Sequence, residues 1–181
     1  RHQQSDLSLA SERDIDTMTD KDVAVPAQSE PREHTLRHHD GRTRSVLVLD
    51  REVPYPEGKL IVSRTDPTGV ITHANQAFVD MSGYTREELI GQPHHILRHP
   101  DMPAAAFKDL WDTLERGVAW QGYVKNLRKD GTYYWVFATA IPNVREGRVV
   151  GYTSVRRKPS ATRVRECVDL YARMRAEELS A

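Results

Sequence analysis

Residues 121–156, QGYVKNLRKDGTYYWVFATAIPNVREGRVVGYTSVR, contain three runs rich in β-branched and aromatic residues, separated by two turn signals. Asp130-Gly131 is a strong hairpin dipeptide, because glycine reaches the left-handed conformation that a tight turn requires. Glu146-Gly147 marks the second turn. The spacing predicts an antiparallel meander of three strands, over residues 121–128, 133–143 and 148–156.

Two shorter strand runs precede this meander. Leu60–Ser63 and Val70–His73 flank the sequence Asp66-Pro67-Thr68-Gly69, whose residue types favour a reversal of the chain. They predict a second hairpin, so the strand candidates outside the N-terminal segment number five.

Short helices are predicted between the two groups of strands. The first covers Ala74–Met81, and the second follows Thr85, which forms a capping-box pattern with Glu88 and is stopped at Gly91. The third covers Pro103–Arg116. Its apolar residues recur at spacings of three and four on one face: Phe107, Leu110, Trp111 and Leu114.

The order of elements predicts an α+β fold, in which a five-stranded antiparallel sheet has short helices on one face. A terminal amphipathic helix follows Pro159, with Val164, Val168, Tyr171 and Met174 at helical spacing. The second sheet face needs a cover, which this helix or a second subunit would supply. The space between sheet and helices suits a small planar ligand.

The chain divides into four parts. Residues 1–45 are polar and are predicted to form a largely disordered leader. A short helix around Ala10–Met18 is an alternative for part of it. The strand-like run Arg44–Asp50 leads into a cap segment. The remaining boundaries place this N-terminal cap at residues 46–57, the folded domain at 58–158 and the terminal helix at 159–181.

The composition argues against several classes of partner. The 26 basic and 26 acidic side chains balance, so nothing favours a polyanion such as nucleic acid. No run approaches the roughly 20 apolar residues of a membrane helix, so no membrane segment is expected in this chain. Cys167 is the single cysteine, which excludes an internal disulfide and favours a reducing compartment.

Catalytic and metal-binding patterns are absent from the sequence. It contains no phosphate-binding glycine loop, no nucleophile elbow and no Cys/His pair in a shared motif, so an enzyme is not expected. His94, His95 and His99 lie close together, but no cysteine or carboxylate accompanies them at a zinc-type spacing. No metal site is expected.

Blocks of the sequence resemble a known family. Residues 75–78 (NQAF) with 82–91 (SGYTREELIG), and residues 124–131 (VKNLRKDG) with Tyr134-Trp135, resemble the two halves of a PAS domain. Residues 91–103, GQPHHILRHPDMP, closely resemble the PAS domains of bacterial aerotaxis receptors, as do Phe107, Trp111, Trp120 and Val124-Lys125-Asn126. The resemblance covers roughly residues 52–175.

The resemblance implies a PAS sensor domain that holds FAD non-covalently and reports its redox state to a signalling module. The chain departs from the family at His95, where the family usually has asparagine, and at Leu127, where a second basic residue is common. The family's ligand positions fall on eight residues: Asn75, Arg98, His99, Asp101, Phe107, Trp111, Asn126 and Tyr134.

Several of these residue types suit a flavin. Phe107 and Trp111 offer aromatic walls, and the amides of Asn75 and Asn126 offer donors and acceptors to the ring edge. The charged group has complementary roles: Arg98 for a phosphate or a flavin anion, His99 as a proton partner on reduction, and Asp101 to orient one of those cations.

Simpler roles stay open for some of these residues. Arg98, His99 and Asp101 would also form a salt-bridge cluster at the start of a helix. Trp111 would serve as a core residue, and Asn75 as a helix cap.

These observations predict a cytoplasmic sensor of redox, oxygen or energy state, whose parent protein is free to carry a membrane anchor. Its expected partner is an output module (a chemoreceptor, a cyclic-dinucleotide enzyme or a kinase) or a second copy in a homodimer. A ligand-free docking or dimerisation module and a haem-based gas sensor are the alternatives. A cysteine–flavin photoadduct is not expected, because the helical region after Tyr84 lacks cysteine and Cys167 follows on the terminal helix.

Overall fold

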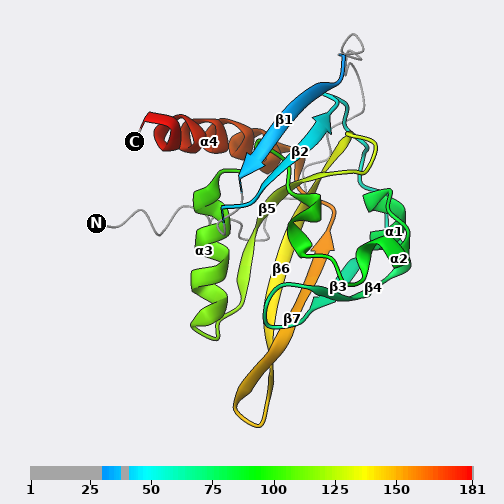
Figure 1. The fold of residues 1–181 in the computed structure, drawn as a ribbon, viewed down its shortest axis with the longest axis vertical. Helices are drawn as coiled ribbons and strands as arrows, with labels where there is room; N and C mark the ends of the chain where they lie inside the picture. The colour runs from blue at the N-terminus through cyan, green and yellow to red at the C-terminus, as the bar shows by residue number, and fades with distance from the viewer. Residues whose placement is uncertain (1–29, 38–40, 181) are drawn as a thin grey trace.

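The computed structural model describes residues 30–37 and 41–180, which form two antiparallel sheets with helices packed around the larger one (Figure 1). The larger sheet has the strand order β4-β3-β7-β6-β5, so β7 is its central strand. Its members are β3 (Ile61–Thr65), β4 (Ile71–Ala74), β5 (Trp120–Leu127), β6 (Tyr133–Arg145) and β7 (Arg148–Arg157). The predicted α+β fold with a five-stranded antiparallel sheet is confirmed.

Most helical elements lie between β4 and β5 in the chain, and one follows β7. They are α1 (Gln76–Ser82), α2 (Arg86–Leu89), the 3-10 helix η1 (His94–Leu97), α3 (Ala104–Glu115) and α4 (Ala161–Ser180). The capping box predicted at the start of α2 is present, since Thr85 and Glu88 each accept a hydrogen bond from the other's backbone N–H. η1 was not predicted, because a single turn is too short to show an apolar period.

Alternation along the strands separates two faces of the sheet. The strand register pairs Asn126 with Tyr134 and Ala138 with Arg156, and we call the face that carries these four side chains the inner face. The short helices cover it. The shared core includes Phe78 of α1, Leu89 of α2, Leu97 of η1, Leu114 of α3 and Val136 of β6.

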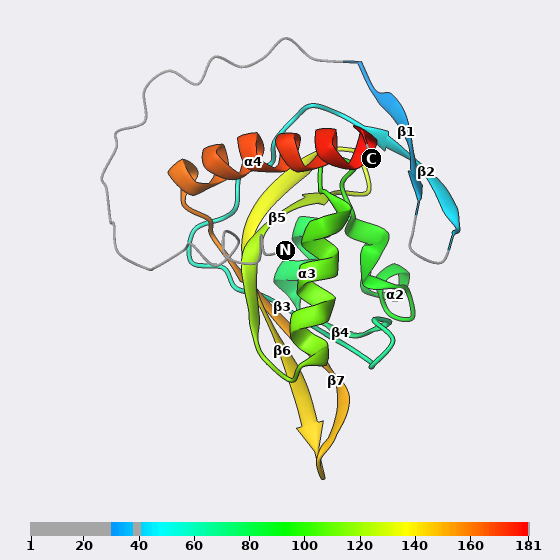
Figure 2. The same ribbon diagram turned by 90° about the vertical axis from the view of Figure 1, so that its left-hand side faces the viewer.

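Helix α4 packs on the opposite, outer face, which carries Lys125 and Trp135 (Figure 2). The rings of Tyr171 and Trp135 stack with their centroids 6.1 Å apart, and the Tyr171 hydroxyl donates a hydrogen bond to the Tyr123 carbonyl at 2.7 Å. The terminal helix therefore supplies part of the cover that the sequence required for this face.

One residue of the predicted apolar stripe on α4, Val168, does not face the sheet. Val168 is 46 % exposed. The contacts with the outer face come from Val164, Cys167, Leu170, Tyr171 and Met174. Spacings of three and four from Val164 reach both Cys167 and Val168, and packing selects Cys167 because Tyr171 and Met174 continue its row.

Strands β1 (Arg32–Arg37) and β2 (Thr43–Val48) form a separate hairpin. This result corrects the prediction of a largely disordered leader for the described residues before position 46. Residues 1–29 and 38–40, including the helix considered around Ala10–Met18, lie outside the described residues. The hairpin is polar apart from a few positions, and Leu36 and Val46 anchor it by burial against Leu127.

The segment after this hairpin runs beside the start of β6. The backbone N–H groups of Leu49 and Val53 donate to the carbonyls of Gly131 and Tyr133, at 2.8 and 2.7 Å. The N-terminal segment is thereby tied to the same end of the sheet that α4 covers.

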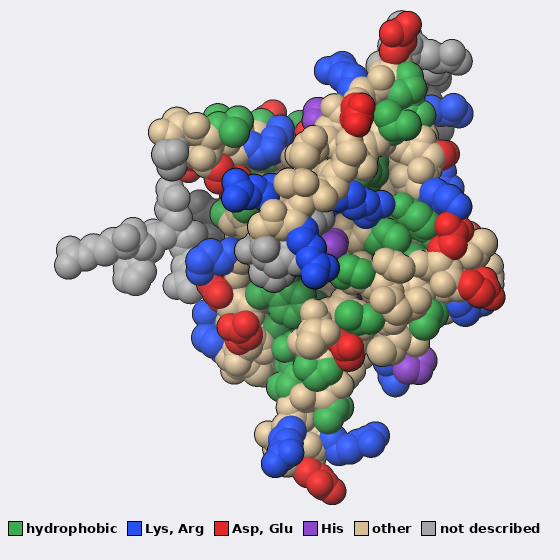
Figure 3. All heavy atoms as spheres, viewed as in Figure 1, with side chains coloured by type: hydrophobic (Ala, Val, Ile, Leu, Met, Phe, Trp, Pro, Cys, Tyr) green, Lys and Arg blue, Asp and Glu red, His purple; other side chains and the backbone are tan. Residues whose placement is uncertain are grey.

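The surface shows no single-sign charge field on the face drawn in Figure 3, where basic and acidic side chains are interspersed. The β6–β7 hairpin projects beyond the helices, and its exposed tip carries Arg145, Glu146 and Arg148 (Figure 1). Among the helices in the described part of the chain, none combines the length and the apolar character needed to cross a bilayer.

The backbone of Gly151 in β7 passes close to the backbone of Thr65 in β3. A substitution at Gly151 therefore tests the register in which these two strands pair. A Cβ built on Gly151 would lie 2.2 Å from the Thr65 carbonyl oxygen, whereas one on Gly147 would meet nothing within 4 Å. We expect Gly151→Ala to destabilise the protein by about 3 kcal/mol, because backbone must shift, and Gly147→Ala by only about 1 kcal/mol. Urea unfolding measures both, and equal costs would contradict the register.

Candidate functional site

The structure distributes the eight predicted residues over three places. The helix start at α1 holds Asn75, and the edge of the sheet beside β5 holds Arg98, His99, Asp101 and Phe107. The side of the sheet that faces the helices holds Asn126 and Tyr134, and Trp111 of α3 packs against the core on that side.

Asn75 acts as the cap of α1. Its Oδ1 accepts hydrogen bonds from the backbone N–H groups of Phe78 (3.0 Å) and Val62 (3.1 Å), and its Nδ2 donates to the Leu60 carbonyl (2.8 Å). The side chain thus joins α1 to β3, as the capping alternative expected. A flavin contact of Asn75 stays a prediction.

Arg98 lies where the loop before α3 passes the edge of β5. Its backbone forms a bridge with Asn126, and its guanidinium stacks over the Phe107 ring at 5.0 Å. One terminal nitrogen donates to the Arg37 carbonyl of the N-terminal hairpin at 3.4 Å, while Nε is buried with no partner among the described atoms. Burial lowers the pKa of Arg98.

His99 is buried and neutral. Its Nδ1 accepts a hydrogen bond from the Asp101 N–H at 2.9 Å, so the ring proton resides on Nε2. Burial, and then the charge of Lys125, lower the pKa of His99 to about 3. The buried Nε2–H has no acceptor among the described atoms, which leaves a donor available to a ligand.

Asp101 joins its loop to two elements, through its carboxyl group and its own backbone carbonyl. Lys125 of β5 donates to Oδ2 at 2.8 Å, and Arg175 of α4 donates to the Asp101 carbonyl. Burial opposes ionisation of Asp101, but the hydrogen bond and charge of Lys125 outweigh it, so the pKa of Asp101 is lowered. Asp101 is thus in a salt bridge, but with Lys125 and not within the cluster of Arg98, His99 and Asp101 that the alternative described.

Trp111 lies on α3 against the β3–β4 turn. Its ring meets Tyr152 edge-on at 5.4 Å and would contact a Cβ built on Gly69 at 3.5 Å. It is partly buried and packs against the main core. The core alternative holds for Trp111, and its ring also borders the inner face.

Tyr134 and Asn126 are register partners on the inner face, and both are buried. The Tyr134 side chain is fully buried, and its hydroxyl lies near the Asn126 side chain without forming a hydrogen bond of acceptable geometry with any described atom. Burial raises the pKa of Tyr134 to about 12, so the group is a neutral donor. An unpaired buried hydroxyl is costly, which marks this spot as one where a ligand atom would be favourable.

Arg156 is a further inner-face residue, on the central strand β7, that no motif in the sequence indicated. It is 2 % exposed. Its two terminal nitrogens donate to His94 Nε2 (2.9 Å) and to Ser63 Oγ (2.6 Å), and its guanidinium lies 4.5 Å from the centre of the Phe78 ring. Arg156 therefore ties η1, β3 and α1 to the sheet.

The partners of Arg156 are neutral. Because arginine only donates, His94 must accept at Nε2 and carry its proton on Nδ1. Burial, and then the charge of Arg156, lower the pKa of His94 to about 3, which agrees with the neutral ring. Burial lowers the pKa of Arg156 itself only to about 10, so it stays charged near neutral pH.

The signal for Arg156 in the sequence was the alternation of β7. Tyr152, Ser154 and Arg156 follow one another at a spacing of two, which places all three on one face. Without the sheet order, this face could not be assigned to the core, and an arginine in a strand is usually solvated.

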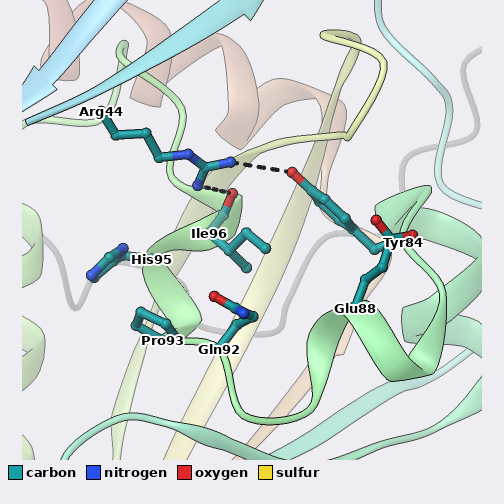
Figure 4. A pocket seen from close by; sticks show the side chains of 7 residues that line it. All are labelled: Arg44, Tyr84, Glu88, Gln92, Pro93, His95 and Ile96. Carbon is teal, nitrogen blue, oxygen red and sulfur yellow. Dashed lines mark hydrogen bonds between the residues drawn. The ribbon is translucent and has the colours of Figure 1, made fainter.

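A pocket of about 430 Å³ opens at a different place, between β2, α2 and η1 (Figure 4). Arg44 crosses it and donates to the Ile96 carbonyl (3.1 Å) and to the Tyr84 hydroxyl (3.4 Å). The pocket is lined by Arg44, Tyr84, Glu88, Gln92, Pro93, His95 and Ile96. None of the eight predicted residues lines it.

Helix α4 also reaches the first turn of α3. Glu178 accepts hydrogen bonds from the N–H groups of Ala104 (3.2 Å) and Ala105 (2.9 Å), which places a carboxylate at the positive end of α3. Through Arg175, α4 is attached to the preceding loop as well.

Residues 71–156 match the family model for the PAS fold. The chain contains a PAS domain. It is 47 % identical over 133 residues to the aerotaxis receptor of Escherichia coli (strain K12), across 74 % of this chain and 26 % of the receptor. The biofilm dispersion protein BdlA of Pseudomonas aeruginosa is 36 % identical over 95 residues, across 49 % of this chain and 22 % of that protein.

A solved light-oxygen-voltage domain, from a study with a flavin analogue, is similar to this PAS domain in structure. It is 28 % identical with a TM-score of 0.53, and the match covers 67 % of this chain and 87 % of that chain. The chain spans about a quarter of the length of the two curated relatives. The resemblance to aerotaxis-type PAS domains is therefore confirmed for the domain, and what the complete protein does is a separate matter.

The structure also bears on the expectations that no cysteine–flavin adduct and no metal site form. Cys167 belongs to α4 and packs toward the outer face of the sheet, where burial raises its thiol pKa to about 11, whereas Tyr134 lies on the inner face. Within residues 30–37 and 41–180, no three His, Cys, Asp or Glu side chains gather in a way that could hold a metal ion.

The neutral, partly buried His94 predicts acid sensitivity. The unfolded chain takes up a proton on His94 near its ordinary pKa of 6.5, whereas the folded protein resists protonation until a pH of about 3. Between these values the unfolded state binds more protons, so stability falls as the pH decreases from about 6.5. Urea unfolding at several pH values gives the free energy of unfolding as a function of pH. We expect this free energy to fall less steeply with decreasing pH in His94→Gln than in the wild type.

The exposed His73 provides the control, because His73→Gln should leave the pH dependence of the free energy of unfolding unchanged. His99 contributes in the same direction, so His94→Gln should remove part of this pH dependence, and a second substitution at His99 should remove more. A His94→Gln protein with the wild-type pH dependence would show that His94 is not held neutral.

Proposed function

We propose that this PAS domain is a sensory module, without a catalytic role, that binds FAD non-covalently and reports redox, oxygen or energy state to an output partner. The observation that carries the proposal is the set of buried polar atoms on the inner face and the loop edge that lack partners. Their donors are Tyr134 Oη, Arg156 Nε, His99 Nε2 and Arg98 Nε.

These donors fit the polar parts of FAD. The ring edge of a flavin presents carbonyl oxygens and nitrogens as acceptors, and its diphosphate is an anion. Tyr134 and Asn126 would hold the ring on the inner face beside Trp111, and Arg98 would hold the diphosphate at the edge of β5. When bound, the flavin supplies reversible electron uptake; the residues of the domain supply binding, orientation and charge.

The backbone bridge between Arg98 and Asn126 supports this assignment, because it keeps the loop edge next to the inner face. The likeness to the aerotaxis receptor and to a light-oxygen-voltage domain studied with a flavin analogue points the same way. The proposed location is the cytoplasm, and the proposed partner is a chemoreceptor region, a cyclic-dinucleotide enzyme, a kinase or a second copy of this chain.

Helix α4 is the proposed route to the output partner. It contacts the outer face through Tyr171, the loop through Arg175 and the start of α3 through Glu178, so it touches both parts of the site from outside. A change in the charge of the ligand would bias these contacts, and coupling of this kind is typically worth about 1–3 kcal/mol.

The absorption spectrum of the purified protein, after reconstitution with FAD, tests the proposed function. A flavin spectrum, with FAD identified by extraction and chromatography, is the expected result. A Soret band would instead indicate haem, and a colourless protein that takes up no FAD would indicate a docking module. Either of these two results would overturn the proposal.

Tyr134→Phe should change stability and affinity in opposite directions. Removal of the unpaired hydroxyl should stabilise the ligand-free protein by about 1 kcal/mol, since a buried group without a partner disappears. FAD binding should weaken about fivefold, because the ring loses a donor. Urea unfolding and FAD titration give the two quantities.

Tyr55→Phe is the matched control, because the Tyr55 hydroxyl already donates to the carbonyls of Lys59 (2.8 Å) and Arg156 (2.9 Å). That substitution should destabilise the ligand-free protein. A Tyr134→Phe protein that is less stable and binds FAD normally would refute the role of Tyr134.

Arg175→Gln should loosen the C-terminal half of α4 without unfolding the sheet. The substitution removes the hydrogen bond to the Asp101 carbonyl, so amides in residues 172–180 should exchange with deuterium faster. Arg173→Gln, on the exposed side of the same helix, is the control. Unchanged exchange in Arg175→Gln would contradict attachment of the helix to the loop.

A further inference from the structure

The guanidinium of Arg156 is a buried charge without a counter-ion. Within residues 30–37 and 41–180, its contacts are the neutral His94, the hydroxyl of Ser63 and the face of the Phe78 ring. None of the ion pairs among the described residues includes Arg156. A charge removed from water is costly unless it is paired, so this arrangement is incomplete as it stands.

Two unpaired atoms lie close together on the inner face. Arg156 Nε belongs to β7 and Tyr134 Oη to the neighbouring strand β6, and each group influences the pKa of the other. Both groups can donate a hydrogen bond. A ligand with several acceptor atoms and a tendency to become negative would satisfy both of them.

We infer that Arg156 faces the electron-rich edge of the bound flavin ring and that its positive charge favours the reduced ring over the oxidised one. The inference rests on the proposed function, and it adds a residue and a direction to it. The contacts to His94, Ser63 and Phe78 hold the guanidinium in place, so Arg156 needs no rearrangement when the ring changes charge.

The charge balance gives the direction of the effect. On reduction, the ring takes up two electrons from a reductant such as dithionite and one proton from solvent, which adds one negative charge to it. Arg156 keeps its own proton throughout. A nearby cation stabilises the added negative charge, so the midpoint potential of the bound flavin should exceed that of free FAD in the same buffer.

Substitution at Arg156 tests the inference. Arg156→Gln removes the charge and should favour the oxidised form at least tenfold, which lowers the midpoint potential by about 30 mV for a two-electron couple. Arg156→Lys keeps the charge and should stay close to the wild type. Arg157→Gln removes the same charge one residue further along β7, on the exposed outer side, and should also stay close to the wild type.

The outcomes separate this inference from the proposed function. Wild-type protein that takes up no FAD overturns both. Protein that binds FAD, but whose potential is unchanged in Arg156→Gln, overturns only the inference, since Arg156 would then merely tie the helices to the sheet.

A further measurement does not depend on the folding of Arg156→Gln. By linkage, wild-type protein should bind reduced FAD more tightly than oxidised FAD, and so raise the midpoint potential above that of free FAD. A bound potential at or below the free value would overturn the inference even if the variant could not be purified.

Discussion

The central strand of the sheet holds a charged guanidinium against the helices, and the nearest groups are all neutral. Arg156 meets His94, Ser63 and Phe78, so η1, β3 and α1 are fixed to β7 through one side chain. His94 can accept from Arg156 only while it stays neutral. The same contact therefore sets the packing of the helices, the protonation of a partly buried histidine and the polarity of the inner face.

The loop that follows η1 connects the inner face to the outside of the domain. Its backbone bridges Asn126, and its Asp101 receives Lys125 from the sheet and Arg175 from α4. The inner face, where the ligand is proposed to bind, and α4, the proposed route to the partner, thus share a single short segment. A domain built this way can pass on a change in ligand charge through a small displacement of one helix, because packed cores are poorly compressible.

The strands, the short helices and the capping box at Thr85 could be predicted from the sequence, because turn chemistry and apolar period act locally. The polar hairpin β1–β2 could not, since only Leu36 and Val46 anchor it and their partner Leu127 is distant in the chain. The motif residues were found by resemblance, but their separation into a helix cap, a loop edge and an inner face required the sheet register. Arg156 was missed because its burial depends on the central position of β7.

A crystal structure of the protein reconstituted with FAD would test the account most directly. We predict ring density on the inner face, with acceptor atoms within hydrogen-bond distance of Tyr134 Oη and Arg156 Nε. An inner face filled by the domain's own side chains, or a flavin bound only in the pocket beside Arg44, would contradict the account.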